Sequence, residues 1–270
     1  MSDFFEVDVD AIGAEELAAS EQLLKFDLGD TRLRILPPWR QGAQYYKPYR
    51  MHFALSDLRN FGLEVEGWYA EPCLSEVAVF DGSSWVIEKN KCPICSLANE
   101  AWRIGSKTGD AEVTDMARKI RAKRQYASNV IDLDNMDKGV QIMVYGKKVF
   151  DGTKALFIRR GNITHIQKGY SIFVTKSEIQ NQKWCDYTVT QDEQADFSEE
   201  WEVIKGQLND LDKFPEYSTY DEIKSRVETV SFGGGISMPT PASQPTAPDG
   251  YTEPKEASDD IDDLLSGIGS

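Results

Sequence analysis

The stretch VTDMARKIRAKRQYASNVIDL, residues 113–133, changes directly from the pattern of a helix to the pattern of a strand. The apolar residues of its first half recur at spacings of three and four, as on a helix with one buried face: Val113, Met116, Ala117 and Ile120. From Tyr126 to Leu133 the period changes to two, which is typical of a strand. This junction predicts a chain in which helices are inserted between strands.

The same two patterns continue on both sides of the junction. Further strands are predicted at 31–36, 45–55, 140–145, 170–176 and 184–190. Further helices are predicted at 14–26, 94–101, 148–159, 198–209 and 219–230, with a break at 105–110. Thr219 and Glu222 fit a capping box at the start of the last helix. Residues 56–92 are predicted to be irregular, so this segment needs something other than a large core to hold it.

The motif Cys92-Pro-Ile-Cys95 opens the helix predicted at 94–101. Two thiolates at this spacing can reach one ion, and a tetrahedral zinc needs two more ligands. The chain has two other cysteines and two histidines. His52 and Cys73 would close the irregular segment onto the strand before it and the helix after it. One alternative is that His52 and Cys73 only pack in the core. Another is that Cys185 completes the site instead of Cys73.

Two other interpretations of the cysteine motif are weaker. A redox Cys-x-x-Cys usually lies in a parallel βαβ unit, and the sequence shows no such unit. A zinc deaminase needs a glutamate two residues after its histidine, but Phe53 and Ala54 follow His52. Four protein ligands would also leave no open position for water, so the predicted metal site is structural.

The net charge of −15 hides a division along the chain. Residues 31–190 contain 24 basic and 17 acidic residues, whereas residues 1–30 contain 1 basic and 9 acidic residues. Residues 191–250 contain 4 basic and 13 acidic residues, and residues 251–270 contain 1 basic and 6 acidic residues. A basic body between acidic ends favours a polyanion-binding domain over a merely solvated acidic surface.

Basic and aromatic residues alternate within this body. Five of the seven residues from Arg118 to Arg124 are basic, and they lead into Tyr126. Cations bind phosphates and aromatic rings stack on unpaired bases, so this composition favours single-stranded nucleic acid over duplex. About half of the strand aromatics are expected in the core. The tight acidic cluster of the body, Asp132, Asp134 and Asp137, is a candidate nuclease site, although its place at a strand end is typical of a turn.

The composition changes from Ser231 onward. Residues 231–250 are rich in Gly and Pro, as in a flexible linker, and residues 259–265 alternate acidic and apolar side chains. No apolar run approaches the roughly 20 residues of a membrane span, and the N-terminal residues show no export signal. We therefore expect a protein that is not secreted and has no membrane partner.

Taken in order, these motifs resemble the single-stranded DNA-binding, helix-destabilising replication proteins of tailed phages. The resemblance covers roughly residues 30–230 and the acidic tail. It is carried by residues 34–38 (RILPP), His52, Cys73, Cys92-Pro-Ile-Cys95, residues 126–129 (YASN), residues 145–150 (YGKKVF) and residues 184–187 (WCDY). Members bind zinc through one histidine and three cysteines, which supports His52, Cys73, Cys92 and Cys95 as ligands of one structural Zn²⁺.

The resemblance also implies the architecture. It implies an α+β fold, mostly β with helical insertions, in which a five-stranded oligonucleotide-binding (OB-fold) barrel carries a small zinc subdomain. The expected organisation is an acidic arm at 1–30, a DNA-binding core at 31–230 with the zinc subdomain at about 50–105, and a linker with a disordered acidic tail at 231–270.

The function that the resemblance implies is sequence-independent binding of single-stranded DNA in phage replication, recombination and repair, without enzymatic activity. The DNA-binding residues it implies are Arg118, Arg121, Lys123, Arg124, Tyr126, Tyr145, Lys147 and Lys148. The acidic tail would recruit replication proteins such as a polymerase or helicase, in the cytoplasm of the infected bacterium. A zinc-bearing RNA-binding or transcription-regulating module is the alternative.

Overall fold

The computed structural model describes residues 22–80, 85–181 and 185–232. Most strands belong to one antiparallel sheet: β1 (Gly29–Ile35), β2 (Lys47–His52), β3 (Glu71–Pro72), β6 (Lys123–Asp132), β7 (Val140–Gly146), β8 (Tyr170–Glu178) and β9 (Cys185–Gln194). A separate hairpin consists of β4 (Glu76–Phe80) and β5 (Trp85–Lys89). The helices are α2 (Pro93–Thr108), α3 (Ala111–Ile120), α4 (Lys147–Arg160), α5 (Trp201–Gly206) and α6 (Tyr220–Val227). Short 3₁₀ helices are η1 (Leu55–Phe61), η2 (Met136–Lys138) and η3 (Leu211–Lys213).

Strand β6 is the centre of the sheet. One of its edges pairs first with β2, where Met51 lies opposite Lys123, and then with β1, where Leu33 lies opposite Asp132. Its other edge pairs with β7. The sheet therefore contains the path β7-β6-β1-β8-β9, with β2 and β3 added beside the first half of β6.

The expected barrel is not confirmed, because the described strands do not close. The described parts of β7 and β9, at the two ends of the five-strand path, share no backbone ladder. Instead, α4 packs against both of these strands. The approach is close at Gly152, where an added Cβ would lie 2.8 Å from the Cβ of Val189. The coarser expectation of an antiparallel sheet with inserted helices is confirmed.

The core explains why residues 126–132 form the central strand. Tyr126 and Val130 face one core cluster, with Leu33, Met143 and Ile172. The opposite face of β6 contributes to two other clusters through Ala127 and Ile131. Because both faces are covered, every residue of β6 from Tyr126 onward is buried.

Ser128 and Asn129, two polar residues inside this buried strand, are hydrogen-bonded. The hydroxyl groups of Ser128 and Tyr145 lie 2.8 Å apart. The Asn129 side-chain amide donates to the carbonyl of Asn209 at 2.9 Å and accepts from the Asn209 backbone N–H at 3.0 Å. The YASN segment thus supplies packing and buried hydrogen bonds, and Asn129 anchors the chain between α5 and η3 to the sheet.

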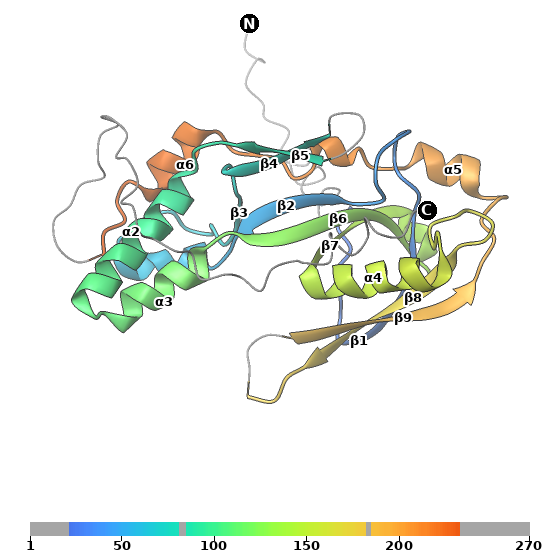
Figure 1. Cartoon of the computed structure of the whole chain (residues 1–270), viewed down its shortest axis with the longest axis horizontal. Helices are drawn as coiled ribbons and strands as arrows, with labels where there is room; N and C mark the ends of the chain where they lie inside the picture. Colours follow the sequence, from blue (N-terminus) through green and yellow to red (C-terminus); the bar gives the residue numbers. More distant parts are fainter. Residues whose placement is uncertain (1–21, 81–84, 182–184, 233–270) are drawn as a thin grey trace, which may run out of the picture. The chain divides into compact units, whose positions relative to one another are not determined.

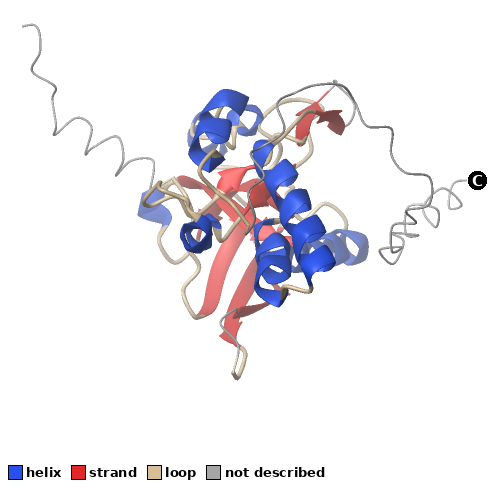
Figure 2. Cartoon of the chain, turned by 90° about the vertical axis from the view of Figure 1, so that its left-hand side faces the viewer, coloured by secondary structure: helices blue, strands red, loops and turns tan. Residues whose placement is uncertain are grey.

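Helices α2, α3 and α6 gather at one end of the sheet, whereas α4 lies over the strands further along (Figure 1). Figure 2 views the molecule from the α2–α3 end and shows helices in front of the strands. The helix break predicted at 105–110 is present but shorter, at Gly109 and Asp110, because α2 continues through Gly105 to Thr108. Gly105 marks a close helix crossing, where an added Cβ would collide with Oγ1 of Thr114. The helix ends at Gly109, which has a φ of 75°.

The structure also differs from the sequence predictions elsewhere, for example in α5, which is shorter than the helix predicted at 198–209. Within the segment predicted to be irregular, it forms η1, β3, β4 and β5. The helix predicted at 14–26 is wrong for its described part, because Leu24 lies extended beside β7 and donates to the Ile142 carbonyl at 3.0 Å. Several predicted segments lie outside the described residues: the rest of that helix, the acidic arm through residue 21, Trp184, and the linker and tail from residue 233. No described helix combines the length and apolar character of a membrane span.

The Asn129 contacts predict a measurable cost of substitution. Asn129→Ala would leave the backbone groups of Asn209 without their partners, which should lower the free energy of unfolding by about 1–3 kcal/mol. Urea unfolding of the variant checks this value. Asn60→Ala, at an exposed position of η1, is the control and should change the stability by less than about 0.5 kcal/mol. Equal stability of the two variants would contradict the anchoring role of Asn129.

Candidate metal centre and nucleic-acid interface

Four side chains from three parts of the chain meet at the α2 end of the sheet. The ligand atoms of His52, Cys73, Cys92 and Cys95 all lie within 4.8 Å of one another. His52 is the last residue of β2, and Cys73 follows β3, where its N–H donates to the carbonyl of Arg50. Cys92 is the N-cap of α2 and Cys95 lies in its first turn. The structure thus brings together the four residues that the sequence singled out.

The distances between these atoms suit a tetrahedral metal ion. His52 Nε2 lies 3.4 Å from Cys92 Sγ and 3.7 Å from Cys95 Sγ, and Cys73 Sγ lies 3.5 Å from Cys95 Sγ. With bonds of about 2.3 Å to sulfur and about 2.0 Å to nitrogen, the edges of a tetrahedron around zinc are about 3.5–3.8 Å long. The site can therefore hold one metal ion without rearrangement of the backbone.

The second nitrogen of His52 fixes the protonation of the ring. Nδ1 lies 2.7 Å from the carbonyl oxygen of Ile120, the last residue of α3. A carbonyl can only accept, so Nδ1 carries the proton and Nε2 presents its lone pair to the thiols. Such an outer hydrogen bond is the usual support of a metal-binding histidine. Sequence patterns carry no signal for this contact, because Ile120 takes part through its backbone.

Ser75 is a further residue that sequence reasoning missed. Its hydroxyl lies 2.9 Å from Cys73 Sγ and 3.5 Å from Cys95 Sγ. A hydroxyl in this position can donate to metal-bound thiolates and hold their orientation. In the sequence, the signal for Ser75 was its position two residues after Cys73, a candidate ligand.

The three thiols share protons unequally. Hydrogen bonds from Cys73 and Cys95 lower the pKa of Cys92 to about 2. Hydrogen bonds with Cys73 and Cys92 raise the pKa of Cys95 above its usual range. A bound cation would favour the thiolate form of all three groups, because a metal ion is the largest local charge in such a site. Four protein ligands would fill its tetrahedron, which makes the site structural rather than catalytic.

The other cysteine and histidine lie elsewhere in the fold. Cys185 begins β9, where it pairs with Glu178 of β8. His165 Nδ1 accepts from the backbone N–H groups of Gln167 and Lys168, which is a local turn contact. The structure therefore groups Cys73, and not Cys185, with His52, Cys92 and Cys95.

The predicted DNA-binding cations form two groups. The first group is exposed at the end of α3 and the start of β6, and we call it the basic row: Arg118, Arg121, Lys123 and Arg124. Within the described part of the chain, none of these four has a carboxylate within 4.0 Å. In the second group, at the start of α4, Lys147 pairs with Asp151 at 3.1 Å and Lys148 pairs with Asp186.

Strand alternation divides the basic row. Arg124 shares a face of β6 with Tyr126, whereas Lys123 points to the opposite face. The Tyr126 hydroxyl lies near Arg124 and Lys147, whose charges oppose the rise in the Tyr126 pKa that burial causes. Arg124 and the start of α4 are therefore neighbours, and Gln125 of β6 lies opposite Gly146 of β7.

The two predicted tyrosines lie in the core. The Tyr126 ring stacks on Phe150 with centroids 3.9 Å apart and planes within 3° of parallel. Tyr145 is 3 % exposed, and burial raises its pKa well above the usual value. In this conformation neither ring presents a free face to a base, so their part in DNA binding stays a prediction. Their contacts instead hold β6, β7 and α4 together.

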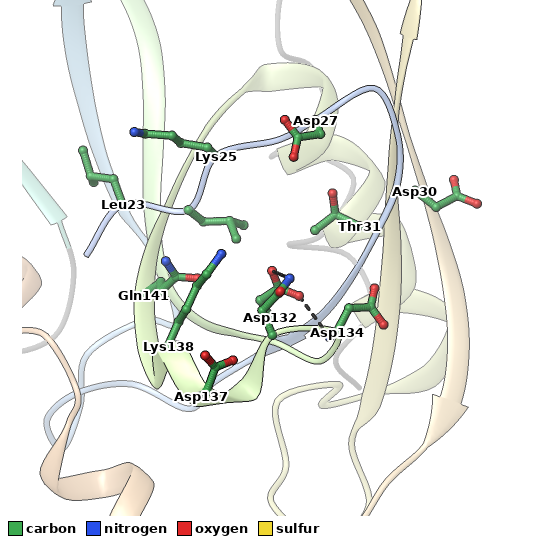
Figure 3. Close-up of a pocket in the computed structure, with 12 residues that line it drawn as sticks. Leu23, Lys25, Asp27, Asp30, Thr31, Asp132, Asp134, Asp137, Lys138 and Gln141 are labelled. Carbon is green, nitrogen blue, oxygen red and sulfur yellow. Dashed lines mark hydrogen bonds between the residues drawn. The ribbon is translucent and has the colours of Figure 1, made fainter. Parts of the chain in front are cut away.

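The acidic cluster lines a pocket with Asp27 and Asp30 at the far end of β6 (Figure 3). Asp132 accepts from the backbone N–H of Asp134 at 3.0 Å and from the side chain of Asn135 at 2.9 Å. Figure 3 shows Asp134 and Asp137 pointing in different directions. These carboxylates do not converge on one point, and their hydrogen bonds fit the interpretation of this segment as a turn.

The metal centre predicts different effects for two cysteines. Cys73→Ser should lose the metal ion and lower the thermal midpoint, because metal binding and folding are coupled at such sites. Cys185→Ser is the matched control and should keep one metal ion per chain. Metal analysis of freshly purified proteins gives the result. Loss of metal from Cys185→Ser, or its retention in Cys73→Ser, would contradict the ligand assignment.

The comparisons with known proteins agree with these features. A family model described as gp32 DNA-binding protein-like matches residues 29–231, from the start of β1 to the segment after α6. A search of the curated proteins found no match. The matched region contains the metal cluster, the basic row and α4. The resemblance noted from the motifs is confirmed, and the chain belongs to the gp32-like family of phage-type single-stranded DNA-binding proteins.

Proposed function

We propose that this protein binds single-stranded DNA with little sequence preference during phage DNA replication, recombination and repair. It protects and presents single strands and catalyses no reaction itself. It works in the cytoplasm of the infected bacterium. The membership in the gp32-like family supports the ligand class.

The observation that carries the proposal is the charge of the basic row. Four exposed cations lie within seven residues and have no carboxylate partner in the described structure. Lys119, between them in the sequence, is 3.6 Å from both Asp57 and Asp115. Like charges without counterions repel one another, and a strand of phosphates supplies the missing negative charge. The other predicted cations, Lys147 and Lys148, continue the contact on the α4 side.

The proposal assigns a role to each part of the fold. The strands β7-β6-β1-β8-β9 form the oligonucleotide-binding unit, which corresponds to the OB fold that the resemblance implies. The metal is Zn²⁺, one per chain, since a set of three thiols and an imidazole suits zinc. The zinc holds the segment between β2 and α2 and thereby sets the position of α3.

The acidic tail recruits replication proteins such as a polymerase or helicase. Its alternating acidic and apolar residues, with Asp259, Asp260, Asp262 and Asp263 around Ile261, Leu264 and Leu265, suit a basic and apolar pocket on a partner. These residues lie outside the described structure, so the sequence alone supports this part.

The basic row predicts the salt dependence of binding. Each of the changes Arg121→Ala and Arg124→Ala should reduce the slope of log affinity against log salt by about 0.7, the value for one phosphate contact on a single strand. Lys123→Ala tests whether the opposite face of β6 also contacts phosphates. Titrations with oligo(dT) at several salt concentrations, followed by tryptophan fluorescence, measure these slopes.

Lys205→Ala is the control, because Lys205 is an exposed cation of α5 without a carboxylate partner in the described structure. Its slope should match that of the unmodified protein. Equal affinity for duplex and single-stranded DNA at matched salt would refute the proposed function. Tighter binding to an RNA of the same sequence would favour the RNA-binding alternative.

A further inference from the structure

Trp102 is an exposed aromatic residue on the helix pair beside the basic row. It lies in the middle of α2 and is 36 % exposed. Its neighbours at the spacing of one helical turn, Ala98 and Gly105, are buried in the packing of α2. The indole thus lies at the border between the packed face of α2 and solvent, although a side chain of this size usually buries most of its surface.

Two cations of the basic row lie over this indole. The guanidinium carbon of Arg118 is 5.4 Å from the ring centroid and that of Arg121 is 6.0 Å from it. Both distances are within the range of a cation–π contact. One exposed ring therefore stands beside two arginines that have no carboxylate partner in the described structure.

This arrangement has the chemistry of a single-strand contact. A base can stack on an exposed aromatic ring or on a guanidinium plane, and the same arginines can bind the adjacent phosphates. Tyr126 and Tyr145 offer no free ring face, so neither supplies the stacking partner that the sequence predicted on the sheet. Trp102 supplies an accessible ring close to the cations.

The arginines join Trp102 to the rest of the proposed groove. Arg121 follows the last residue of α3, and β6 begins two residues later. Arg124 and Lys147, at the start of α4, both lie near the Tyr126 hydroxyl. Cations thus continue from the α2–α3 pair to the sheet, with Trp102 at one end (Figure 1 shows α3 running into β6).

We propose that Trp102, with Arg118 and Arg121, is a base-stacking site that extends the path of single-stranded DNA from β6 onto the α2–α3 helix pair. This inference rests on the proposed function and identifies a contact that it does not require. It explains why an indole is kept at the surface among arginines that have no described carboxylate partner. It also predicts that the variant effects depend on the length of the DNA, because a short strand can bind the sheet without reaching α2.

Removal of the ring tests the site. Trp102→Leu should weaken binding of a long oligo(dT) about five- to tenfold, at the low end of the range for one stacked base. Its salt slope should stay within about 0.2 of the original, since no phosphate contact is removed. Trp102→Phe keeps an aromatic ring and should weaken binding less than about threefold. The effect of Trp102→Leu should shrink as the oligonucleotide is shortened.

Two controls separate stacking from a structural role. Tyr69→Leu changes another exposed aromatic residue, 65 % exposed and without a described cation over its ring, and should leave affinity unchanged. Metal content and the thermal midpoint of Trp102→Leu should match those of the original protein. If Trp102→Leu instead reduces the salt slope by about 0.7, its role is to position Arg118 or Arg121, and the stacking inference is wrong.

The failure of this inference differs from the failure of the proposed function. Unchanged oligo(dT) affinity of Trp102→Leu, together with a reduced slope for Arg124→Ala, would overturn the stacking site alone. If Trp102→Leu leaves the affinity unchanged and the protein shows no preference for single-stranded over duplex DNA, both the stacking site and the proposed function are wrong. A five- to tenfold weakening that Trp102→Phe largely restores supports the site.

Discussion

The two ring nitrogens of His52 connect the metal centre to the surface proposed to bind DNA. Nε2 faces the thiols of Cys92 and Cys95, and Nδ1 donates to the carbonyl of Ile120 at 2.7 Å. That carbonyl belongs to the last turn of α3, where a helix leaves its oxygens without partners inside the helix. A metal ion on Nε2 would fix the ring and strengthen this hydrogen bond. We infer that a metal ion at this site would help to hold α3 in position, together with the packing of α3 on α2.

The rest of the α2 end follows from this constraint. The segment between β2 and α2 buries Leu55, Leu58, Leu63 and Trp68. Its two cysteines, Cys73 and Cys92, meet at the candidate metal site. The helix α3 ends at Ile120, and the basic row runs from Arg118 in its last turn to Arg124 at the start of the central strand. Four exposed cations with no described carboxylate partner repel one another. The helix pair α2–α3 on one side and the buried strand β6 on the other hold them in place.

The sequence predicted the parts of this arrangement that depend on local patterns. The period of the apolar residues located α3 and β6, and the Thr219–Glu222 capping box is present at the start of α6. The ligand set was found because the chain has so few cysteines and histidines. The strand β2 is shorter than its aromatic pattern suggested, and η1 takes up Leu55 at its predicted end.

The parts that depend on long-range contacts could not be predicted. Gly105 is a helix breaker by local preference, but the crossing of α3 over α2 requires a residue without a side chain there. Tyr126 and Tyr145 carry the same sequence signal whether they stack on a base or pack in the core, as Tyr126 does on Phe150. The hydrogen bond from His52 to the carbonyl of Ile120 could not be predicted, because every residue type has a backbone carbonyl.

The most direct test of this account is the effect of metal removal on DNA binding by the full-length protein. The metal is removed with a chelator, and oligo(dT) affinity is measured over a range of salt before and after zinc is restored. The account predicts that the metal-free protein binds more weakly and that its salt slope falls by about 0.7 for each phosphate that the basic row no longer binds, with both effects reversed by zinc. A metal-free protein that binds oligo(dT) with unchanged affinity and slope would contradict it.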